Sequence, residues 1–427
     1  MVLTAVLACT NMTSCSEAEL LKNPPLKGVK EDETVEDDLR VGESNIFEST
    51  YGRRGKIALG ERQQAISMRI NDFSWSVFSR MFGAKSEVNL LVSPLSLTQN
   101  IMMLGNGLKG EAQEKVKSAL GVSDFEMKEI NSYVYQVNNG LDNVDRCAKF
   151  RRDNALWHTN RMNVQQEFKE NTSRSYKADI FPAMMNEQTK DSINWWAREK
   201  TYGRIEWMTD NLNGEDAVMT NANYFRGLWR DELSEKNIFL GEFRNESGVL
   251  EQVNMVSYHR VSLYVEGQTY QATRRSFGNA AFFMDFILPK EGVAPQEALA
   301  EFVGENEYSK KLMIVNLDFP LFTSASRVDL VQQLQDMGIN GIFGENNTNS
   351  VCLFSEPIFV NSIIQKNYLS LDEKGTESAT GLYAAKFDTA EEVKEEVDMT
   401  LNRPFFYAIS ELSTMTPLFI GYQGSVK

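Results

Sequence analysis

The stretch DEKGTESATG, residues 372–381, decides the fold together with LNRPFF at 401–406 and LFIG at 418–421. The first stretch is small and polar, and its Gly375 has access to backbone conformations that other residues avoid. Residues 386–398 then hold six acids and two bases. The two later stretches are short and apolar, which is typical of strands. The chain therefore places a long acidic connection before its final strands.

Strand-like runs lie mostly in the second half of the chain. They are short and apolar, and they occupy residues 218–225, 282–288, 312–319, 358–364, 405–409 and 418–421. The pattern also predicts a helix that Ser326 caps and Gly338 ends, with Leu330, Leu334 and Met337 on one face.

Helical patterns dominate the first half. Apolar residues at helical spacing predict a helix from about 64 to 83. Ser93 is a good N-cap and Pro94 a good first residue, so a second helix is expected through Met103, and a third at 111–120. Helices early and strands late, without regular βαβ alternation, indicate an α+β fold.

The composition is that of a globular protein with an excess of acid. The 427 residues include 44 Lys and Arg against 59 Asp and Glu, a net charge of −15, with 42% hydrophobic residues. This charge argues against a nucleic-acid partner. No apolar run is long enough for a transmembrane helix. Length alone suggests two or three domains.

Catalytic and metal-binding motifs are absent from the sequence. It has only two histidines, His158 and His259, and lacks HExxH, GxSxG, Walker A and paired-cysteine zinc patterns. A GxGxxG match at 105–110 follows a predicted helix rather than a strand, so we interpret it as a loop. Cys147 and Cys352 are interpreted as lone buried thiols. The sequence predicts no metal site, no cofactor and no enzyme.

The N-terminus resembles the end of a bacterial lipoprotein signal. An apolar run, Val2–Ala8, leads to two candidate acylation sites, Cys9 and Cys15, of which Cys15 is slightly favoured because acids follow it. The next residues are polar, acidic and unable to bury much apolar surface, so a disordered tether is expected. The expected parts are a signal remnant at 1–15, a tether at 16–60 and a folded body at 61–427. We expect an extracellular or cell-envelope location with a lipid anchor.

Further motifs, taken in chain order, resemble one family. They are the NxxxSPxS pattern at 89–96, NALW at 154–157, INWW at 193–196 with Thr201, NANYFRGLW at 221–229, the helix of 326–338 and the three stretches quoted first. The ordered set resembles the serpin family over roughly residues 64–425. The resemblance implies one α+β domain of about nine helices and three β-sheets, which revises the count suggested by length.

The resemblance also implies a suicide inhibitor of serine, sometimes cysteine, proteases. The protease cleaves an exposed loop, here about residues 373–400, and is trapped as an acyl-enzyme while the loop inserts into the large sheet. Such a protein needs no cofactor and is expected to be a monomer. A non-inhibitory binding or chaperone protein of the same fold is the alternative. A surface hydrolase that uses both histidines is a third hypothesis.

The hinge of that loop corresponds to Gly375, Thr376, Glu377, Ser378, Ala379 and Thr380. Because strand side chains alternate, insertion would turn inward Thr376, Ser378, Thr380, Leu382 and Ala384. None of these is a proline or a charged residue, which favours an inhibitory member. Leu382 and Tyr383 are bulkier than is usual in the family, so slow insertion is expected.

The scissile bond of the family usually follows the fourteenth residue after the hinge glycine, which implies Thr389–Ala390. A threonine before the cut suits an elastase-like or broad-specificity protease. Cuts after Phe387 or Lys386 would suit chymotrypsin-like or trypsin-like enzymes and would shorten the inserting strand. We expect the acids at 386–398 to steer a basic protease towards the loop.

The resemblance places a polar shutter beneath the sheet, formed by Ser93 and Ser96 with Asn221 as a neighbour. Trp229 is expected where the loop first enters. The usual histidine of the family is replaced by Gln365, whose amide can both donate and accept hydrogen bonds. A hydrogen-bonded shutter without a pH response is therefore expected.

Overall fold

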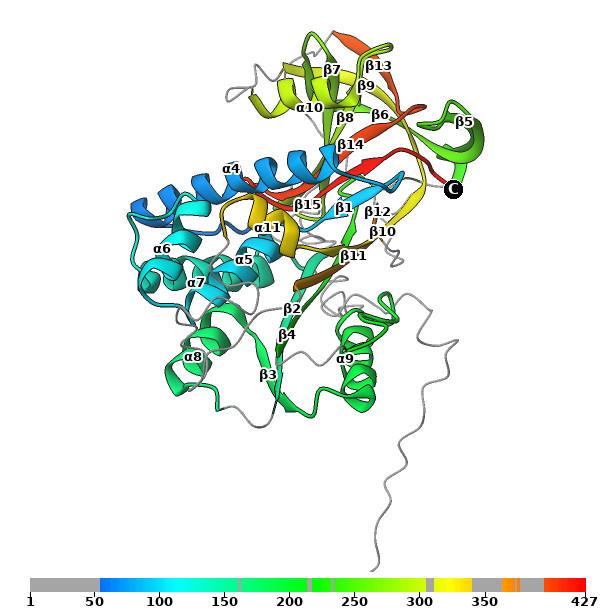
Figure 1. The fold of residues 1–427 in the computed structure, drawn as a ribbon. Helices are drawn as coiled ribbons and strands as arrows, with labels where there is room; N and C mark the ends of the chain where they lie inside the picture. The colour runs from blue at the N-terminus through cyan, green and yellow to red at the C-terminus, as the bar shows by residue number, and fades with distance from the viewer. Residues whose placement is uncertain are drawn as a thin grey trace, which may run out of the picture.

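The computed structural model describes residues 54–159, 163–212, 217–231, 233, 235–304, 311–339, 363–372, 375–376 and 395–427. In this part of the chain there are eight α-helices, α4 (Glu61–Gly83), α5 (Pro94–Gly105), α6 (Gly110–Ala119), α7 (Met127–Asn143), α8 (Gln166–Asn171), α9 (Glu187–Lys200), α10 (Pro295–Gly304) and α11 (Val331–Asp336). A π-helical turn, Thr172–Tyr176, and a 3₁₀ turn, Glu235–Asn237, complete the helical elements. Figure 1 shows α4 to α8 grouped together and α9 set apart from them.

A six-stranded sheet forms the first of two hydrogen-bonded networks. Its strands are β2 (Ala148–Thr159), β3 (Asp179–Ala183), β4 (Ala217–Leu228), β10 (Phe322–Asp329), β11 (Ile363–Leu371) and β12 (Gly375–Thr376). They follow the order β10–β11–β4–β2–β3, and β12 pairs with β4.

A nine-stranded network holds the other strands. They are β1 (Leu90–Val92), β5 (Ile238–Arg244), β6 (Leu250–Glu266), β7 (Tyr270–Phe277), β8 (Phe282–Pro289), β9 (Lys311–Pro320), β13 (Glu396–Thr400), β14 (Phe405–Glu411) and β15 (Thr416–Gln423). The order is β1–β15–β14–β8–β7–β6–β9–β13, with β5 on β6. Three sheets were expected, but the long β6 pairs with β5, β7 and β9 and so joins these strands into one network.

The early helices confirm the sequence predictions. The helices expected at 64–83, after Ser93 and at 111–120 are α4, α5 and α6. The GxGxxG match joins the end of α5 at Gly105 to the start of α6 at Gly110. It is therefore a helix-to-helix loop, as its position after a helix indicated.

The helix predicted from Ser326 is wrong at its start. Residues up to Asp329 belong to β10, where Ser326 pairs with Asn367 of β11, and α11 begins only at Val331. Strand pairing across the sheet thus overrides a local capping pattern, because propensity is only a weak preference. The strand predicted at 358–364 begins at Ile363 in the structure, and residues 358–362 lie outside the described residues.

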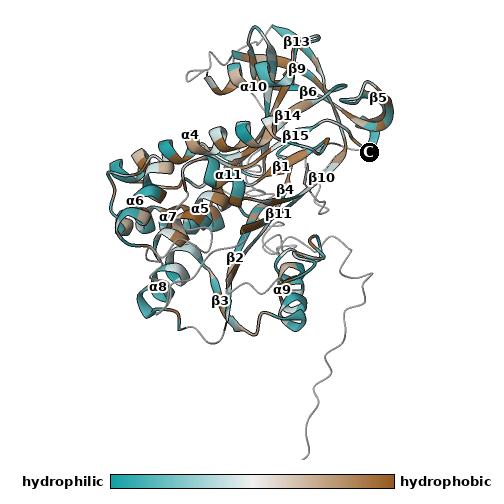
Figure 2. Cartoon of the chain, in the orientation of Figure 1, coloured by the Kyte–Doolittle hydropathy of each residue, from teal (hydrophilic) through white to brown (hydrophobic). Residues whose placement is uncertain are grey.

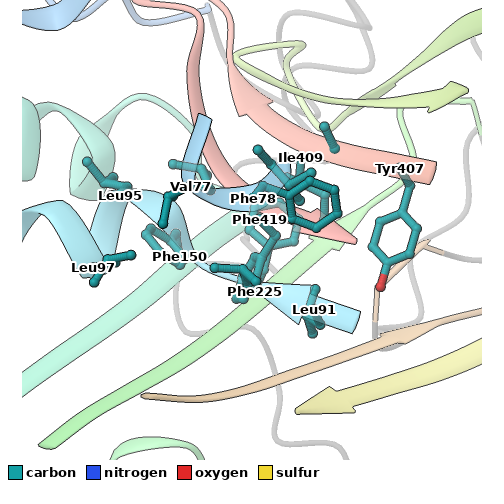
Figure 3. Close-up of a cluster of buried hydrophobic side chains, with 14 of the residues drawn as sticks. Val77, Phe78, Leu91, Leu95, Leu97, Phe150, Phe225, Tyr407, Ile409 and Phe419 are labelled. Atoms are coloured by element: carbon teal, nitrogen blue, oxygen red, sulfur yellow. The ribbon is translucent and has the colours of Figure 1, made fainter. Parts of the chain in front are cut away.

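The main core lies between the early helices and the two sheets. Figure 3 shows Phe78 of α4 and Leu95 of α5 beside Phe150, Phe225 and Phe419, which come from β2, β4 and β15. Every residue of α5 is buried, and Figure 2 shows this helix as largely hydrophobic. Full burial of α5 fixes the start of that helix beneath the six-stranded sheet.

A second, smaller cluster lies on the opposite face of the same sheet. It contains Ile193 and Trp196 of α9, Ala222 of β4 and Ile364 of β11. We call the face of the sheet that packs on the main core the inner face, and the face that packs on α9 the outer face. Because strand side chains alternate, neighbours along β4 and β11 belong to opposite faces.

The folded body begins earlier than predicted. The tether was expected to extend to residue 60, but Ile57 is buried and its N–H donates to Ser413 Oγ at 2.9 Å. The N–H of Gly55 donates to Val144 O. The rest of the tether and the signal remnant lie outside the described residues. Among the helices of the described part, none combines the length and apolarity needed to cross a membrane.

Candidate functional site

The strands β4 and β11 pair in parallel along only part of their length. Residues 363–368 of β11 pair with 219–224 of β4. Further along β4, Gly227 and Leu228 pair instead with Thr376 and Gly375 of β12, in antiparallel orientation. We call the boundary between β4 and β11 the seam. The chain thus turns back after β11 and begins to pair with β4 where the parallel pairing has ended.

The turn at the end of the seam requires a glycine. Gly375 has a φ of 139°, a conformation that other residues rarely adopt. Its N–H donates to Asp372 Oδ1 at 2.9 Å, and the N–H of Asp372 donates to Gly375 O at 2.7 Å. A Cβ atom at this position would lie 2.1 Å from Gly227 O. Both the conformation and the close approach to β4 therefore exclude a side chain.

Gln365 closes the inner face of the seam from the β11 side. Its Oε1 accepts a hydrogen bond from the N–H of Ser93 at 3.0 Å, and its Nε2 donates to Ser93 O at 3.0 Å. The same Nε2 donates to Asn221 Oδ1 on β4 at 3.3 Å. One fully buried amide therefore ties β11 both to the start of α5 and to β4.

Three asparagines extend this network across the sheet. Asn223 Nδ2 donates to Asn367 Oδ1 at 3.0 Å, which is a second bond across the seam, and also contacts Asn221 Oδ1. Asn221 Nδ2 donates to Asn154 Oδ1 on β2 at 2.7 Å. Asn367 Nδ2 in turn donates to Leu91 O at 3.0 Å. Buried amides are satisfied here by one another, as burial requires.

The two serines join the network from α5. Ser93 Oγ donates to Ser96 Oγ at 3.1 Å, and Ser96 Oγ donates to Asn223 Oδ1 at 2.5 Å. Ser93 occupies the N-cap position of α5, but its hydroxyl makes no capping bond. The Ser93 hydroxyl therefore bonds within the network at the seam and does not cap the helix. We call these seven side chains the amide network, which consists of Ser93, Ser96, Asn154, Asn221, Asn223, Gln365 and Asn367.

No member of the amide network is ionisable. Arg152, the residue in register with Asn223 on β2, is buried but bonds to Asn138 and Asp142 instead. Burial lowers the pKa of this arginine, and Asp142 opposes that shift. Among the described residues, the amide network on the inner side of the seam therefore contains only uncharged side chains.

Trp229 lies buried just beyond the paired end of β4. Its indole stacks on Phe277 with ring centroids 4.4 Å apart, and its Nε1 donates to Asp372 O at 3.3 Å. Asp372 is the residue at which the chain begins its turn towards Gly375. The indole thus holds the turn by its one polar atom while its rings fill the core.

A buried cation, Lys366, lies on the outer face of the seam. Lys366 lies between Gln365 and Asn367 on β11, and its Nζ lies 2.9 Å from the centroid of the Trp207 ring and bonds to Trp207 O. Burial, with the nearby positive charge of Arg327, lowers the pKa of Lys366 to about 8. Trp207 belongs to the connection between α9 and β4, so this contact ties β11 to that connection.

The structure brings most of the shutter residues named from the sequence into one place. Ser93, Ser96, Asn221 and Gln365 belong to the amide network, while Trp229 lies further along β4 at the turn, next to Gly375 and Thr376. The remaining candidates lie outside the described residues, namely Glu377, Ser378, Ala379, Thr380, Lys386, Phe387, Thr389, Ala390, Cys9 and Cys15.

Three members of the amide network were not identified as site residues from the sequence. Asn223 and Asn367 each follow a recognised amide by two positions, and Asn154 was noted only as part of a motif. In an otherwise apolar strand, two amides at a spacing of two share a face. That spacing is the signal that would have found Asn223 and Asn367.

The two histidines do not form a common site. His158 is buried in β2, with Nδ1 2.9 Å from Thr159 O, and burial lowers its pKa. His259 is exposed on β6, in the other sheet, where it contacts Asn316. Within the described ranges, no group of three or more His, Cys, Asp or Glu residues is placed to hold a metal ion.

The two sheets, the seam and the chain that turns back along β4 define a serpin fold. The chain belongs to the serpin (serine protease inhibitor) family, whose model matches residues 68–423. Horse (Equus caballus) alpha-1-antiproteinase 2 is 25% identical over 380 residues, which cover 84% of this chain and 86% of the relative. Guinea pig (Cavia porcellus) alpha-1-antiproteinase S is 24% identical over 387 residues, with 86% and 91% covered.

Solved structures show the same fold. The native thermophilic serpin tengpin matches with a TM-score of 0.77 at 24% identity, over 86% of this chain and 95% of that one. Human thyroxine-binding globulin matches with a TM-score of 0.75 at 21% identity, over 86% and 99%. The expected α+β serpin architecture is confirmed. Because serpins are protease inhibitors and not catalysts, the chain is not an enzyme, and the partners of its family are serine proteases in general.

Proposed function

We propose that the protein inhibits serine-type endopeptidases as a suicide substrate, by inserting its cleaved loop into the seam. The observation that carries this proposal is the pairing of Gly375 and Thr376 with β4. These two residues begin the hinge, and they lie where β11 no longer pairs with β4. A strand can grow from this start by adding backbone hydrogen bonds to an existing edge.

The register of this pairing gives each loop residue up to Lys386 a partner on β4. Continued residue by residue, it would put Thr380 opposite Asn223 and Lys386 opposite Ala217, where β4 begins. The ten residues from 377 to 386 would become newly paired, and at a net bond of roughly 0.5–1.5 kcal/mol each they would gain on the order of 10 kcal/mol. The uncleaved protein must therefore be kinetically trapped.

The same register supports a proposal for the slow step of insertion. Leu382 would arrive opposite Asn221, inside the amide network. Its side chain cannot replace the hydrogen bond that Asn221 shares with Gln365, whereas Thr380 could bond to Asn223. We infer that insertion slows when Leu382 reaches the network. A Leu382→Thr variant should inhibit faster than the unmodified protein.

We propose Thr389–Ala390 as the reactive bond and an elastase-like or broad-specificity serine protease, with cysteine proteases as a further class, as the target. An inserted strand that fills β4 would end at Lys386, which leaves three residues to link the sheet to the trapped protease. A cut after Phe387 or Lys386 leaves one residue or none. A threonine before the cut fits a pocket for small side chains.

The test is to mix the protein with elastase, chymotrypsin, trypsin and subtilisin and to examine each mixture by SDS gel and mass spectrometry. A complex that survives SDS, together with a released peptide that begins at Ala390, supports the proposal. Cleaved chain beside a fully active protease in every mixture would reject inhibition. A released peptide that begins at Phe387 or Asp388 would instead assign the reactive bond to Lys386–Phe387 or Phe387–Asp388.

The alternative is a non-inhibitory binding or chaperone protein on the same fold, since the structural relatives include thyroxine-binding globulin. Thermal unfolding before and after limited proteolysis of the loop separates the two. Insertion should raise the melting temperature markedly, because the new strand completes the sheet. An unchanged melting temperature after cleavage would favour the alternative.

We also propose that the protein is lipid-anchored at a bacterial cell surface through Cys15, or through Cys9. The support is the short apolar run before these cysteines and the acidic spacer after them. Expression in a bacterium with labelled palmitate should label the protein. The label should be lost in Cys15→Ser but kept in Cys9→Ser, and the reverse result would assign the anchor to Cys9. Labelling of neither form would reject the anchor.

A further inference from the structure

A buried arginine lies directly against the tryptophan at the end of the seam. The guanidinium carbon of Arg275, on β7, is 4.0 Å from the centroid of the Trp229 ring and 4.0 Å from that of Tyr258. Arg275 is 2% exposed, and Phe319 approaches the same group at 5.3 Å. A planar cation stacked on aromatic faces is attracted to both and restrains their positions.

Arg275 makes few hydrogen bonds, so its contacts with the aromatic rings help to fix the position of its guanidinium. Its Nη2 donates to Asp231 O at 3.1 Å, and the carboxylate of Asp231 is engaged by the hydroxyl of Tyr258 at 2.7 Å. Its Nη1 has no hydrogen-bond acceptor among the described residues. Burial lowers the pKa of Arg275 to about 10, so the group remains a cation at neutral pH. The buried cation is thus held by the carbonyl and charge of Asp231 and by Tyr258, while its planar group also lies against the rings of Trp229 and Tyr258.

Trp229 transmits this restraint to the hinge. Its Nε1 bonds to Asp372 O, and Asp372 bonds through backbone and carboxylate to Gly375. We propose that Arg275 is a positioning residue for loop insertion, which clamps the indole of Trp229 so that the turn from Asp372 to Gly375 stays closed until the loop is cut. The consequence for insertion rests on the proposed function, whereas the clamp itself does not.

The clamp is tested by Arg275→Lys, which keeps a positive charge but has no planar group to stack. The matched control is Arg274→Lys on the same strand. Arg274 forms a bidentate pair with Asp285 at 2.6 and 2.8 Å and lies over Phe283, away from Trp229. Acrylamide quenching of tryptophan fluorescence should increase in Arg275→Lys and not in Arg274→Lys. In a Trp229→Phe background the Arg275→Lys increase should disappear, and its persistence there would overturn the clamp.

The effect on insertion is measured as the rate at which uncleaved protein converts to the heat-stable form at elevated temperature. Arg275→Lys should convert about fivefold faster, because a lysine ammonium has no plane that can lie against both rings. Tyr258→Leu should do the same and Tyr258→Phe should not, so a poorly folding arginine variant does not end the test. Wild-type conversion rates in Arg275→Lys and Tyr258→Leu would overturn the positioning role. Absence of any heat-stable form, even after loop cleavage of the unmodified protein, would instead reject the proposed function and leave the quenching test to judge the clamp.

Discussion

Replacing Gln365 by alanine tests the seam most directly. Its Oε1 accepts from the N–H of Ser93 and from Asn367 Nδ2, and its Nε2 donates to Ser93 O and to Asn221 Oδ1. The side chain is fully buried. Alanine removes all four bonds and leaves an unfilled space between β11 and the start of α5.

The substitution does not leave the four bonding partners of Gln365 equally short of hydrogen bonds. Ser93 O keeps a bond from the N–H of Leu97 at 3.1 Å, and Asn367 Nδ2 keeps Leu91 O at 3.0 Å. The N–H of Ser93 loses the acceptor that Gln365 provides, and a buried donor without an acceptor costs about 1–3 kcal/mol. The space left by the side chain adds roughly 1 kcal/mol. The native state should therefore lose about 2–4 kcal/mol, or about 3–5 °C in melting temperature for a domain of this size.

The assay is thermal unfolding of the uncleaved protein, followed by the rate of conversion to the heat-stable form without protease. The Gln365→Ala variant should melt lower and convert faster, because its seam opens more readily. Gln252→Ala is the matched control, since Gln252 is exposed on β6 and its side chain donates to Glu242 at 3.0 Å. The control should melt within about 1 °C of the unmodified protein.

The reasoning is refuted if Gln365→Ala melts and converts like the control. That result would mean that the amide network contributes nothing to closure and that packing alone holds β4 against β11. A lower melting temperature with an unchanged conversion rate would also contradict the proposal, because it would show that Gln365 stabilises the fold without guarding the seam.

Three further predictions concern the hinge, the outer face and the acidic loop. Gly375→Ala should shift protease mixtures from SDS-stable complex towards cleaved chain, because its Cβ would clash with Gly227 O and displace β12; unchanged complex yield would contradict this. Lys366 has a pKa lowered to about 8, whereas a lysine in an unfolded chain titrates near about 10.4. Between these values the unfolded chain binds more protons, so native stability should rise with pH by about 1–3 kcal/mol, and Lys366→Met should lack the rise in urea titrations. Inhibition of a basic protease should slow several-fold between roughly 0.05 and 0.5 M salt, and a salt-independent rate would remove the steering role of residues 386–398.

The local parts of the site could be predicted from the sequence, and its assembly could not. Ser93 before Pro94 indicates a helix start, and the family resemblance associates Gln365 with it. The bond from Gln365 to Asn221 joins residues 144 positions apart. No local pattern reports which two strands lie side by side, so the partner of each amide depends on sheet order. The spacing of two between Gln365 and Asn367 indicates that the two amides share a face, but only the structure shows that both bond across the seam.

Ser326 shows the opposite failure, in which a strong local pattern misleads. Its sequence context has the spacing of a helix cap, yet its hydroxyl bonds to Leu91 O and receives Asn367 Nδ2 at 3.2 Å. The residue therefore fastens β10 and β11 to β1. Arg275 was missed for a related reason, because only the fold brings Arg275 of β7 between Tyr258 of β6 and Trp229, which follows β4.

Under the proposed mechanism, the amide network would hold the seam closed and still let it open for an inserting strand. Apolar side chains across β4 and β11 would resist a new strand, because separating them exposes surface without an exchange of partners. Each amide both donates and accepts, so Asn223 and Asn367 can exchange the bond between them for bonds to an incoming residue. Thr380 can take part in that exchange and Leu382 cannot. The balance between these two loop residues should set the inhibition rate, and a Thr380→Val variant should be slowed while Leu382→Thr is accelerated. Equal rates in both variants would show that the network does not control insertion.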